Sequence, residues 1–322
     1  MLKPISGTWF EFRHHNPAEG RYWNEALQGF SSEQWKEKIE EIASLGMEYI
    51  VLMASALKDE DREECYFETD IFPFADMKCT APMDVLFEAC EKFGIKVFVS
   101  CGFYGVWTDT LNNMTSEAVT ERAFKAMEVL YKKYGKYKSF YGWYYPDETC
   151  INEYFDERFI SYVNRYSEYV HKLAPDTKTL IAPYGTQLAK ADGKFIEQLK
   201  RLDVDIIAYQ DEVGVQKAAP NETKKSYERL SEAHAKAGRA AIWADMEIFE
   251  FEGEVYNSAL IPAAFERIQK QLDSVSPYVD TILCYQYQGM INKPETPAYC
   301  GAEGSAELYR RIRALNAEAY GI

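Results

Sequence analysis

The sequence predicts an α/β protein built as one (β/α)8 barrel, and three observations favour that fold. Short apolar or aromatic runs alternate strictly with longer amphipathic stretches, and each kind occurs eight times. Strict alternation of strand and helix predicts a parallel sheet, and eight strand–helix pairs are the number that closes into a barrel. The length of 322 residues suits one large α/β barrel. We therefore expect a single barrel domain over residues 1–322.

The eight expected strands are short and rich in Val, Ile, Phe, Tyr and Trp, the residue types that favour buried strands. They cover residues 7–12, 49–53, 96–104, 140–145, 179–183, 205–210, 240–245 and 281–287. An open, doubly wound sheet is the alternative architecture. Such a sheet usually carries a glycine-rich phosphate loop after its first strand, and the run GTWFEF at residues 7–12 has none.

The expected helices lie between these strands and have recognisable ends. The stretch 32–45 begins within the run Ser-Ser-Glu at 31–33, places Trp35 and Ile39 at helical spacing, and stops at Gly46. The full set covers residues 32–45, 82–93, 116–134, 156–173, 193–202, 222–237, 262–275 and 306–317. With eight strands and eight helices in turn, each helix is expected to cover the outside of the barrel.

Three long irregular stretches, at residues 13–30, 54–81 and 289–305, each follow an expected strand. In a barrel, segments that follow strands lie at the C-terminal face, which carries catalysis in enzymes of this fold. Long loops at that face predict a walled cleft for a sizeable ligand.

Charge and composition narrow the classes of ligand. The net charge of −15, from 36 basic and 51 acidic residues, repels nucleic acid and anionic membranes but not neutral substrates. Tyrosine, with 24 copies, dominates an aromatic content of 15%, and its flat face and hydroxyl suit clefts that bind sugars. For any single tyrosine, plain surface cover is the alternative. We expect a carbohydrate substrate and neither nucleic acid nor membrane as a partner, and the oligomeric state stays open.

The seven cysteines are odd in number and include no C-x-x-C pair, which indicates neither a disulfide framework nor a zinc ribbon. Free thiols in a reducing cytoplasm are the simplest interpretation. The start MLKPISG lacks the features of a signal peptide, and no apolar run reaches the roughly 18 residues that span a bilayer. We expect a cytoplasmic protein, although a trimmed signal peptide would leave the same start.

Carboxylates, amides and aromatic rings gather at the ends of the expected strands, with almost no cations among them. Carboxylates and amides bind hydroxyl groups, while aromatic faces stack on the C–H side of a pyranose ring. This mixture predicts a carbohydrate site. The candidate substrate-binding residues are Glu11, Tyr104, Trp107, Trp143, Tyr184, Tyr209, Gln210, Asp211, Glu212, Trp243, Asp245, Tyr285 and Tyr287.

Several of these candidates have a plain alternative. Asp211 can orient a water or bind a hydroxyl, or it can cap a turn before Gly214. Glu212 is a reserve for Glu148 in catalysis. Tyr285 and Tyr287 share a face of the last expected strand, where they can form the floor of the site or belong to the core.

Alternation on the seventh expected strand points two carboxylates at the barrel axis. Trp243, Asp245 and Glu247 share one face, and the residues of the other face are wholly apolar and should point at the helices. A buried carboxylate costs several kcal/mol unless it is paired or used. The alternative is a pair of ordinary acids in an exposed loop. We therefore expect Glu247 to be a catalytic group.

Glu148 follows the fourth expected strand, directly after a run of aromatic residues. Because Pro146 interrupts that strand, alternation does not settle the direction of Glu148. The alternative is that Asp147 and Glu148 cap the next helix, or that Asp147 positions the chain while Glu148 does the chemistry. Two carboxyl groups across a pocket can divide the roles of acid and nucleophile when their environments separate their pKa values.

Several runs resemble a bacterial family of glycosidase-like barrels known mainly as a domain of unknown function, DUF4434. The resemblance rests on GWYYPDE at 142–148, YQDEVG at 209–214 and WADMEIFE at 243–250. The runs ISGTWF at 5–10 and LGMEYI at 45–50 are similar to that family too. The resemblance thus covers almost the whole chain and implies a barrel that resembles glycosidases.

Glutamates at the ends of strands 4 and 7 also resemble the large clan of retaining (β/α)8 glycoside hydrolases. In that clan the strand-4 residue is the acid/base and the strand-7 residue is the nucleophile. The resemblance implies that Glu148 is the acid/base and Glu247 the nucleophile. Where the clan usually carries Asn before the acid/base, this chain has Asp147.

A retaining glycoside hydrolase that acts on a neutral or mildly polar glycan is the function that these features favour. A divalent-metal sugar isomerase or epimerase is the second hypothesis, with oxygen ligands from Glu148, Asp211, Asp245 and Glu247, although it lacks a histidine at a strand end. A catalytically silent sugar-binding barrel is the third, if the two glutamates lie more than about 10 Å apart. For the leading hypothesis we expect no cofactor and no metal.

Overall fold

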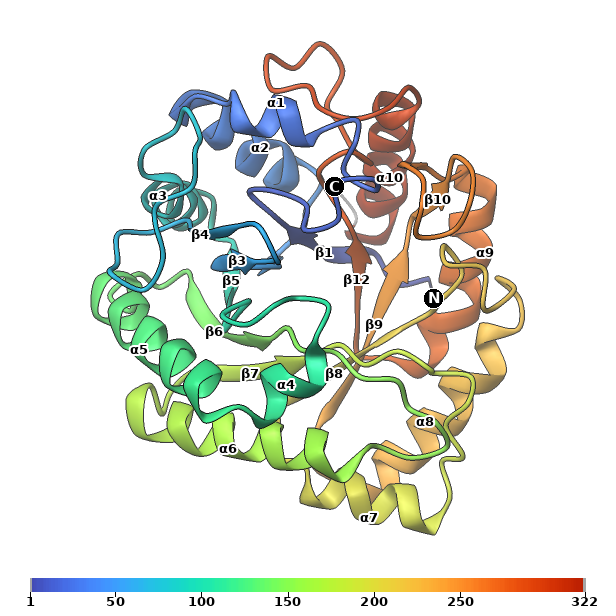
Figure 1. Cartoon of the computed structure of the whole chain (residues 1–322). Coiled ribbons are helices and arrows are strands. Elements are labelled where there is room, and N and C mark those ends of the chain that lie inside the picture. The colour runs from blue at the N-terminus through green and yellow to red at the C-terminus, as the bar shows by residue number, and fades with distance from the viewer. Residues whose placement is uncertain (1, 321–322) are drawn as a thin grey trace.

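Eight parallel strands close into a barrel in the computed structural model, which describes residues 2–320. Around the barrel they follow the order β1, β12, β9, β8, β7, β6, β5 and β2 (Figure 1). Their bounds are β1 (Ile5–Phe10), β2 (Tyr49–Leu52), β5 (Lys96–Ser100), β6 (Phe140–Tyr145), β7 (Lys178–Ile181), β8 (Ile206–Gln210), β9 (Ala241–Glu247) and β12 (Thr281–Tyr285). The predicted (β/α)8 barrel is therefore confirmed.

Helices cover the outside of the barrel, as Figure 1 shows. They are α2 (Ser32–Ser44), α3 (Pro82–Phe93), α5 (Glu117–Tyr134), α6 (Glu157–Leu173), α7 (Gly193–Arg201), α8 (Thr223–Ala237), α9 (Phe265–Val275) and α10 (Ser305–Tyr320). The ends of α2 and α3 follow their local sequence. A capping box between Ser31 and Gln34 begins α2, and Gly94, with a left-handed φ of 72°, ends α3. Helix α9 begins later than expected because Pro262 pairs with Phe249 in a short hairpin.

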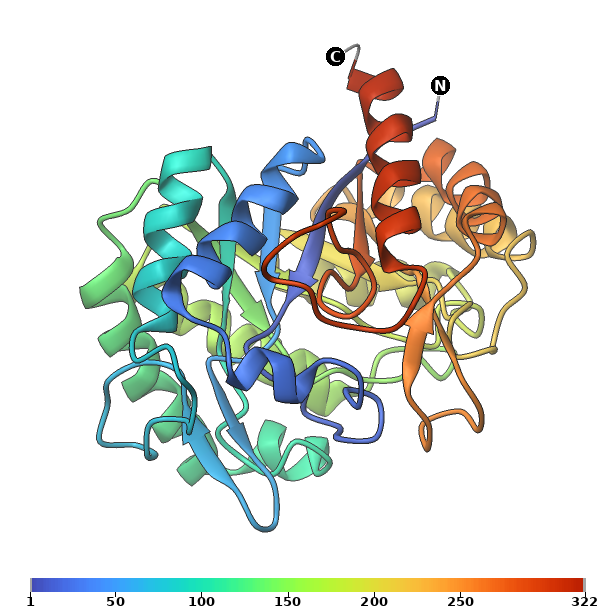
Figure 2. The same ribbon diagram turned by 90° about the horizontal axis from the view of Figure 1, so that it is seen from above.

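The long loops that follow β2 and β9 each fold into a hairpin. One hairpin consists of β3 (Ala56–Lys58) and β4 (Glu63–Cys65), and the other of β10 (Phe249–Phe251) and β11 (Leu260–Pro262). Figure 2 shows both hairpins on the side opposite the two chain termini. The short helices α1 (Asn24–Gln28), α4 (Thr110–Thr115) and η1 (Ser276–Tyr278) complete the described elements. The hairpins therefore wall the C-terminal face of the barrel.

Two apolar layers separate the side chains that face the barrel axis from those that face the helices. The inner layer includes Trp9, Phe98, Tyr144, Leu180, Trp243 and Leu283. The outer layer includes their chain neighbours, such as Phe10, Trp143 and Tyr145. Because successive side chains of a strand point to opposite faces, this division decides which residues can reach the mouth of the barrel. Within residues 2–320, no helix combines the length and the apolar character that crossing a membrane requires.

Candidate active site

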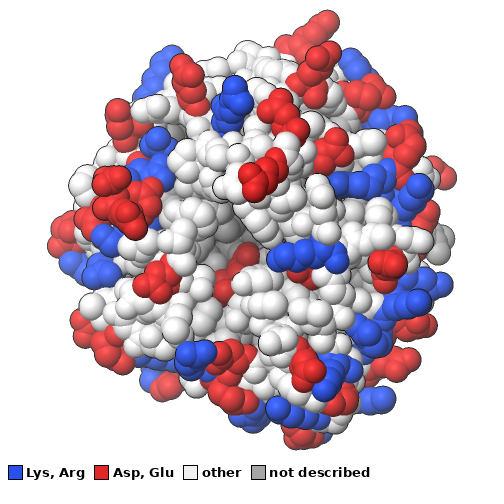
Figure 3. Space-filling view, turned by 45° about the vertical axis from the view of Figure 1, so that its right-hand side comes forward, with Lys and Arg blue, Asp and Glu red and all other residues white. Residues whose placement is uncertain are grey.

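The C-terminal ends of β6, β8 and β9 bring three of the predicted residues together. Glu148 accepts a hydrogen bond from the side-chain amide of Gln210 (2.7 Å between Oε2 and Nε2), and Gln210 lies in register with Asp245 on β9. Glu148 also accepts a hydrogen bond from the hydroxyl of Tyr144 (2.8 Å). Figure 3 shows a hollow near the centre of one face, with acidic atoms inside it and a rim of mostly uncharged residues that carries a basic side chain on one side.

The environment of Glu148 suits a group that holds and releases a proton near neutral pH. The residue is half-buried at the barrel mouth. Burial raises the pKa of its carboxyl to about 7, while the hydrogen bonds from Tyr144 and Gln210 oppose that rise and the charge of Asp147 adds to it. A carboxyl group with a pKa near the working pH is an efficient general acid and base.

The neighbouring Asp147 points away from the cleft. Its carboxylate accepts hydrogen bonds from Asn113 (2.8 Å) and from the hydroxyl of Tyr162 on α6 (3.4 Å). Helix α6 is capped by Asp156, so neither Asp147 nor Glu148 serves as the helix cap. Asp147 is buried in the helix layer, where it fixes the chain that presents Glu148 to the cleft.

Glu247 is the last residue of β9 and is only 4% exposed. Its Oε2 accepts a hydrogen bond from the backbone N–H of Val215, in the loop after β8 (2.8 Å). Its own N–H donates to Asp211 Oδ1 (3.1 Å). Burial raises the pKa of the Glu247 carboxyl, and the charges of Asp211 and Glu212 raise it further. The backbone N–H groups of Val215 and Gly214 act the other way and favour the ionised form of Glu247.

Asp245 lies two residues earlier on β9 and faces the barrel axis. It is 2% exposed, and its Oδ1 has no hydrogen-bond partner among the described residues. Burial raises the pKa of this carboxyl well above its usual value, and the charges of Glu148, Glu247 and Asp211 act in the same direction. Asp245 is therefore a buried acid that is close enough to Glu148 for their charges to interact.

The two acids that follow β8 support the loops around the site. Asp211 accepts hydrogen bonds from Gln271 of α9 (2.7 Å) and from two backbone N–H groups, one of them that of Glu247. Glu212 accepts one from the N–H of Thr186 (2.9 Å), and its Oε1 lies 3.8 Å from the ammonium of Lys217. Asp211 thus fixes the end of β9, and Glu212 ties the loops after β7 and β8 together.

A hydrogen-bonded cluster at the end of β1 was not expected from the sequence. Glu11 accepts hydrogen bonds from Trp23 (2.8 Å) and Gln286 (2.9 Å), and it also contacts Nδ1 of His14 (2.9 Å). The other ring nitrogen of His14 lies 3.0 Å from a carboxylate oxygen of Glu19. Burial alone would lower the pKa of His14, but the charges and hydrogen bonds of the two carboxylates raise it to about 9. His14 is therefore an imidazolium cation at neutral pH.

This cluster bears on the metal hypothesis. Ligand atoms of Glu11, His14 and His15 lie within 4.8 Å of one another. Both ring nitrogens of His14, however, are engaged by carboxylates, and a protonated imidazole cannot bind a metal ion. Glu11, predicted to bind a substrate hydroxyl, is buried, and its carboxylate is engaged by Trp23, Gln286 and His14.

Aromatic side chains line the mouth of the barrel. The ring of Trp107 lies 4.5 Å from the ring of His15, and Tyr285 packs at 6.4 Å against Trp9. Tyr184, at the end of β7, lies under the ammonium of Lys217 at 5.1 Å. Trp107, Tyr285 and Tyr184 are only half-buried, so each offers a surface on which a sugar ring can stack.

Five predicted residues do not face this cleft. Trp143 packs against Phe140 in the outer layer, and the hydroxyl of Tyr209 contacts His234 of α8. Tyr287 follows the end of β12, so the expected alternation with Tyr285 is broken, and its hydroxyl donates to Glu41 of α2. The remaining two are also buried: Tyr104 contacts Ser55 and Phe72, and Trp243 packs against Tyr49 and Phe98 at the start of the inner layer.

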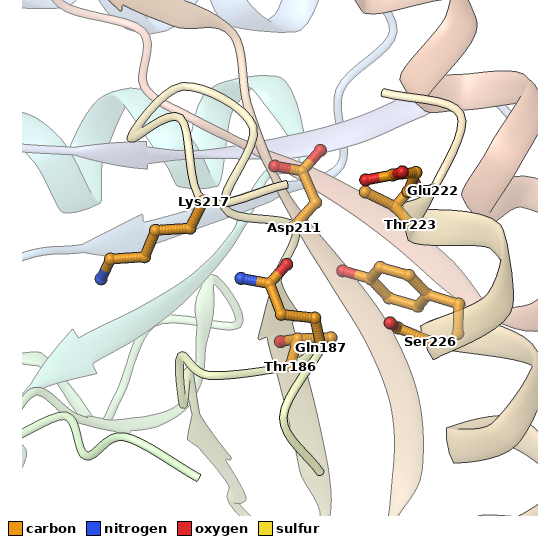
Figure 4. Close-up of a pocket in the computed structure, with 8 residues that line it drawn as sticks. Thr186, Gln187, Asp211, Lys217, Glu222, Thr223 and Ser226 are labelled. Atoms are coloured by element: carbon orange, nitrogen blue, oxygen red, sulfur yellow. The ribbon is translucent and has the colours of Figure 1, made fainter. Parts of the chain in front are cut away.

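A pocket of about 190 Å³ lies behind the β8 loop, beside the cleft. Figure 4 shows that the ammonium group of Lys217 points away from Thr223 and Ser226 on the far wall of this pocket. The pocket is lined by Thr186, Gln187, Asp211, Lys217, Glu222, Thr223, Ser226 and Tyr227. The Lys217 ammonium therefore contributes to the rim of the cleft, over Tyr184, rather than to this pocket.

Solved structures with the same fold include several named as glycoside hydrolases. A candidate α-L-fucosidase from Bacteroides thetaiotaomicron VPI-5482 has a TM-score of 0.75 at 15% identity, over 100% of this chain and 94% of that one. A GH5_18 protein from Streptomyces cattleya in complex with Manb1-4GlcNAc has a TM-score of 0.58 at 17% identity, over 98% and 82%. A β-galactosidase from Halorubrum lacusprofundi has a TM-score of 0.61 at 11% identity, over 98% and 58%. At these identities the likeness shows a shared fold.

No curated protein matches the sequence. The profile of one family, described as "Domain of unknown function (DUF4434)", matches residues 5–298. That match spans β1 to the loop after β12 and so includes all eight barrel strands and every candidate site residue, but not α10. The resemblance found in the sequence is thereby confirmed, and the chain belongs to the DUF4434 family.

Proposed function

We propose that the protein is a retaining glycoside hydrolase in which Glu148 is the acid/base and Glu247 the nucleophile. The observation that carries this proposal is the setting of Glu148. It is a half-buried carboxyl group with a pKa of about 7, bound by Tyr144 and Gln210, at the mouth of a barrel lined with aromatic rings. The glycoside hydrolases that share the fold support the same reaction class.

The proposed reaction has two steps. In the first, Glu148 protonates the glycosidic oxygen as the bond to the leaving group breaks, and the Glu247 carboxylate bonds to the anomeric carbon. In the second, Glu148 takes a proton from water, whose oxygen attacks the anomeric carbon and releases Glu247. The N–H of Val215 stabilises the anion of Glu247 before the first step and after the second.

The substrate is proposed to be a glycan without a strong negative charge. The cleft presents carboxyl and amide groups from Glu148, Gln210 and Asp245, which bind hydroxyl groups. Half-buried Trp107 and Tyr285 offer faces for the apolar side of a sugar ring. The protein's net charge of −15 adds a long-range repulsion against anionic substrates.

A screen of 4-nitrophenyl glycosides with different sugars and both anomers tests this proposal. We expect hydrolysis of at least one glycoside, with loss of at least about a thousandfold in kcat for Glu148→Gln and Glu247→Gln. Glu250→Gln is the matched control, because Glu250 lies three residues further on, in β10, outside the site. Sodium azide should restore turnover of Glu247→Ala as a glycosyl azide, because the small anion occupies the vacated place of the carboxylate. Full activity of Glu247→Gln would disprove the nucleophile assignment.

A further inference from the structure

Asp245 differs from the other buried carboxyl groups around the cleft in its hydrogen bonds. Glu148 accepts hydrogen bonds from Tyr144 and Gln210, and Glu247 accepts one from a backbone N–H. Asp211 and Glu212 have donors as well. Among the described residues, Glu212 Oε1 and Asp245 Oδ1 are both buried without a hydrogen-bond partner, but Glu212 has the Thr186 donor at Oε2. Within residues 2–320, no hydrogen bond reaches the carboxyl group of Asp245, which is only 2% exposed. Asp245 is therefore the acid of this group whose anion the protein stabilises least.

The charges around Asp245 also disfavour its anion. The charges of three carboxyl groups act on it: Glu148 in the loop after β6, Asp211 at the end of β8, and Glu247 of its own strand. The other titratable groups near it are Tyr144 of β6 and Tyr285 of β12, with Cys284 and Tyr227, all neutral near pH 7. No lysine, arginine or histidine of the described chain forms an ion pair with it. A proton on Asp245 relieves this crowding of negative charge.

We propose that Asp245 acts as a neutral carboxyl group at the floor of the cleft, where it binds a substrate hydroxyl by donating one hydrogen bond and accepting another. This inference rests on the proposed glycosidase function and adds a substrate requirement to it. A neutral carboxyl has one O–H donor and one carbonyl acceptor, which match the donor and acceptor of a hydroxyl group. Substrates that carry a hydroxyl at this position are preferred over substrates with a carboxylate there, which would lie beside the Glu247 anion.

Two substitutions separate a neutral role from a charged one. Asp245→Asn keeps one donor and one acceptor but cannot ionise, whereas Asp245→Leu has a similar size and neither. We expect Asp245→Asn to retain kcat/KM within about tenfold on the best 4-nitrophenyl glycoside, and Asp245→Leu to lose at least about a hundredfold, largely through KM. Loss of a thousandfold or more in Asp245→Asn would overturn the proposal, because it would mean that the carboxylate anion is required.

The pH dependence of kcat/KM distinguishes a neutral Asp245 from an ionised one, which a loss of stability alone would not do. If Asp245 is neutral, Asp245→Asn removes no charge beside Glu148, so the basic limb of kcat/KM stays in place. If Asp245 is an anion, its removal lowers the pKa of Glu148, and the basic limb moves to lower pH. A shift to lower pH of half a unit or more would therefore contradict the proposal.

Thermal unfolding between pH 4 and pH 9 tests the protonation of Asp245 without any substrate. A carboxyl with a raised pKa in the folded state contributes most to stability below the pKa of the unfolded chain, and that contribution is lost as the pH rises. Because asparagine does not titrate, the Tm of Asp245→Asn minus that of the wild type should grow with pH. The exposed Asp176→Asn should show a flat difference. A flat difference for Asp245→Asn would overturn the proposal, even if no glycoside is hydrolysed and the proposed function fails.

Discussion

Gln210 and Asp245 lie in register on adjacent strands, yet the side-chain amide of Gln210 donates to Glu148 and to the carbonyl of Ala182. Two acids at the barrel mouth, Glu148 and Asp245, therefore differ in the hydrogen bonds that their carboxyl groups receive. Glu148 receives a hydrogen bond that favours its ionised form, and Asp245 beside Gln210 receives none at Oδ1. The difference in hydrogen bonding gives Glu148 and Asp245 different proton affinities. Such a difference is required if Glu148 donates protons while Asp245 binds a hydroxyl group.

Gln210→Met should shift the pH dependence of hydrolysis. Methionine keeps the length of the side chain but removes the amide that donates to Glu148 Oε2. Because that hydrogen bond lowers the pKa of Glu148, its loss raises the pKa further above its ordinary range. The basic limb of kcat/KM should move to higher pH by about half a unit to one unit, measured between pH 5 and pH 9. The exposed Gln269→Met serves as control, and an unmoved limb would show that Glu148 does not set it.

The Glu11–His14–Glu19 cluster predicts a pH-dependent loss of stability. The pKa of His14 is raised to about 9 in the folded protein, above the ordinary 6.5. The contacts of protonated His14 with Glu11 and Glu19 stabilise the fold fully below about pH 6.5, and this stabilisation is lost as the pH rises through about 9. The pKa difference corresponds to roughly 3 kcal/mol in the free energy of unfolding. Melting curves of the wild type from pH 6 to pH 9.5 measure it.

His14→Gln is the variant that tests the source of this pH dependence. Its Tm should be lower than that of the wild type at pH 6, because Glu11 and Glu19 lose their cation, and the difference should shrink toward pH 9.5. His171→Gln removes a solvent-exposed histidine of α6 and should leave the pH profile of the wild type in place. If His14→Gln keeps the same slope of Tm against pH, another group causes it.

The barrel was predictable because its strands and helices have different periods in the sequence. The direction of the β9 side chains was predictable for the same reason. One face of the strand is wholly apolar (Ile242, Ala244 and Met246) and packs on the helices, so Asp245 points inward. On β6 the run FYGWYY has aromatic residues on both faces, so alternation does not distinguish the inward Tyr144 from the outward Trp143.

The cluster around Glu11 was not predictable for a different reason. Its partners His14, Glu19 and Trp23 lie in an irregular loop, and Gln286 lies at the other end of the chain. No periodic pattern relates residues that meet through loop geometry and through the closure of β1 against β12. The expectation that Tyr287 shares a face with Tyr285 failed for a similar reason. Strand β12 ends at Tyr285, and side chains alternate between faces only while the strand continues.

Gln271→Leu should weaken both the fold and the reaction. The amide of Gln271 donates to Asp211 Oδ2 and to the carbonyl of Glu247, and its removal leaves a buried carboxylate without that donor. Such a loss costs about 1–3 kcal/mol in the free energy of unfolding, measured by urea titration. Because Asp211 also binds the N–H of Glu247, kcat should fall as well. Gln269→Leu, two residues earlier and exposed on the same helix, should leave both unchanged. Equal stabilities of the two variants would contradict this role of Gln271.

Removal of divalent metal ions separates hydrolysis from metal-dependent isomerisation. Dialysis against EDTA should leave kcat/KM for the best aryl glycoside unchanged, because the proposed steps use protons of Glu148 and the carboxylate of Glu247. The grouped Glu11, His14 and His15 should not bind Mn²⁺ at pH 7, because His14 is held as a cation between two carboxylates. Isothermal titration of the EDTA-treated protein with MnCl₂ checks this directly, with His14→Gln as the comparison. Activity lost on dialysis and restored by Mn²⁺ would instead favour an isomerase or epimerase, whose metal ligands would include the carboxylates of β8 and β9.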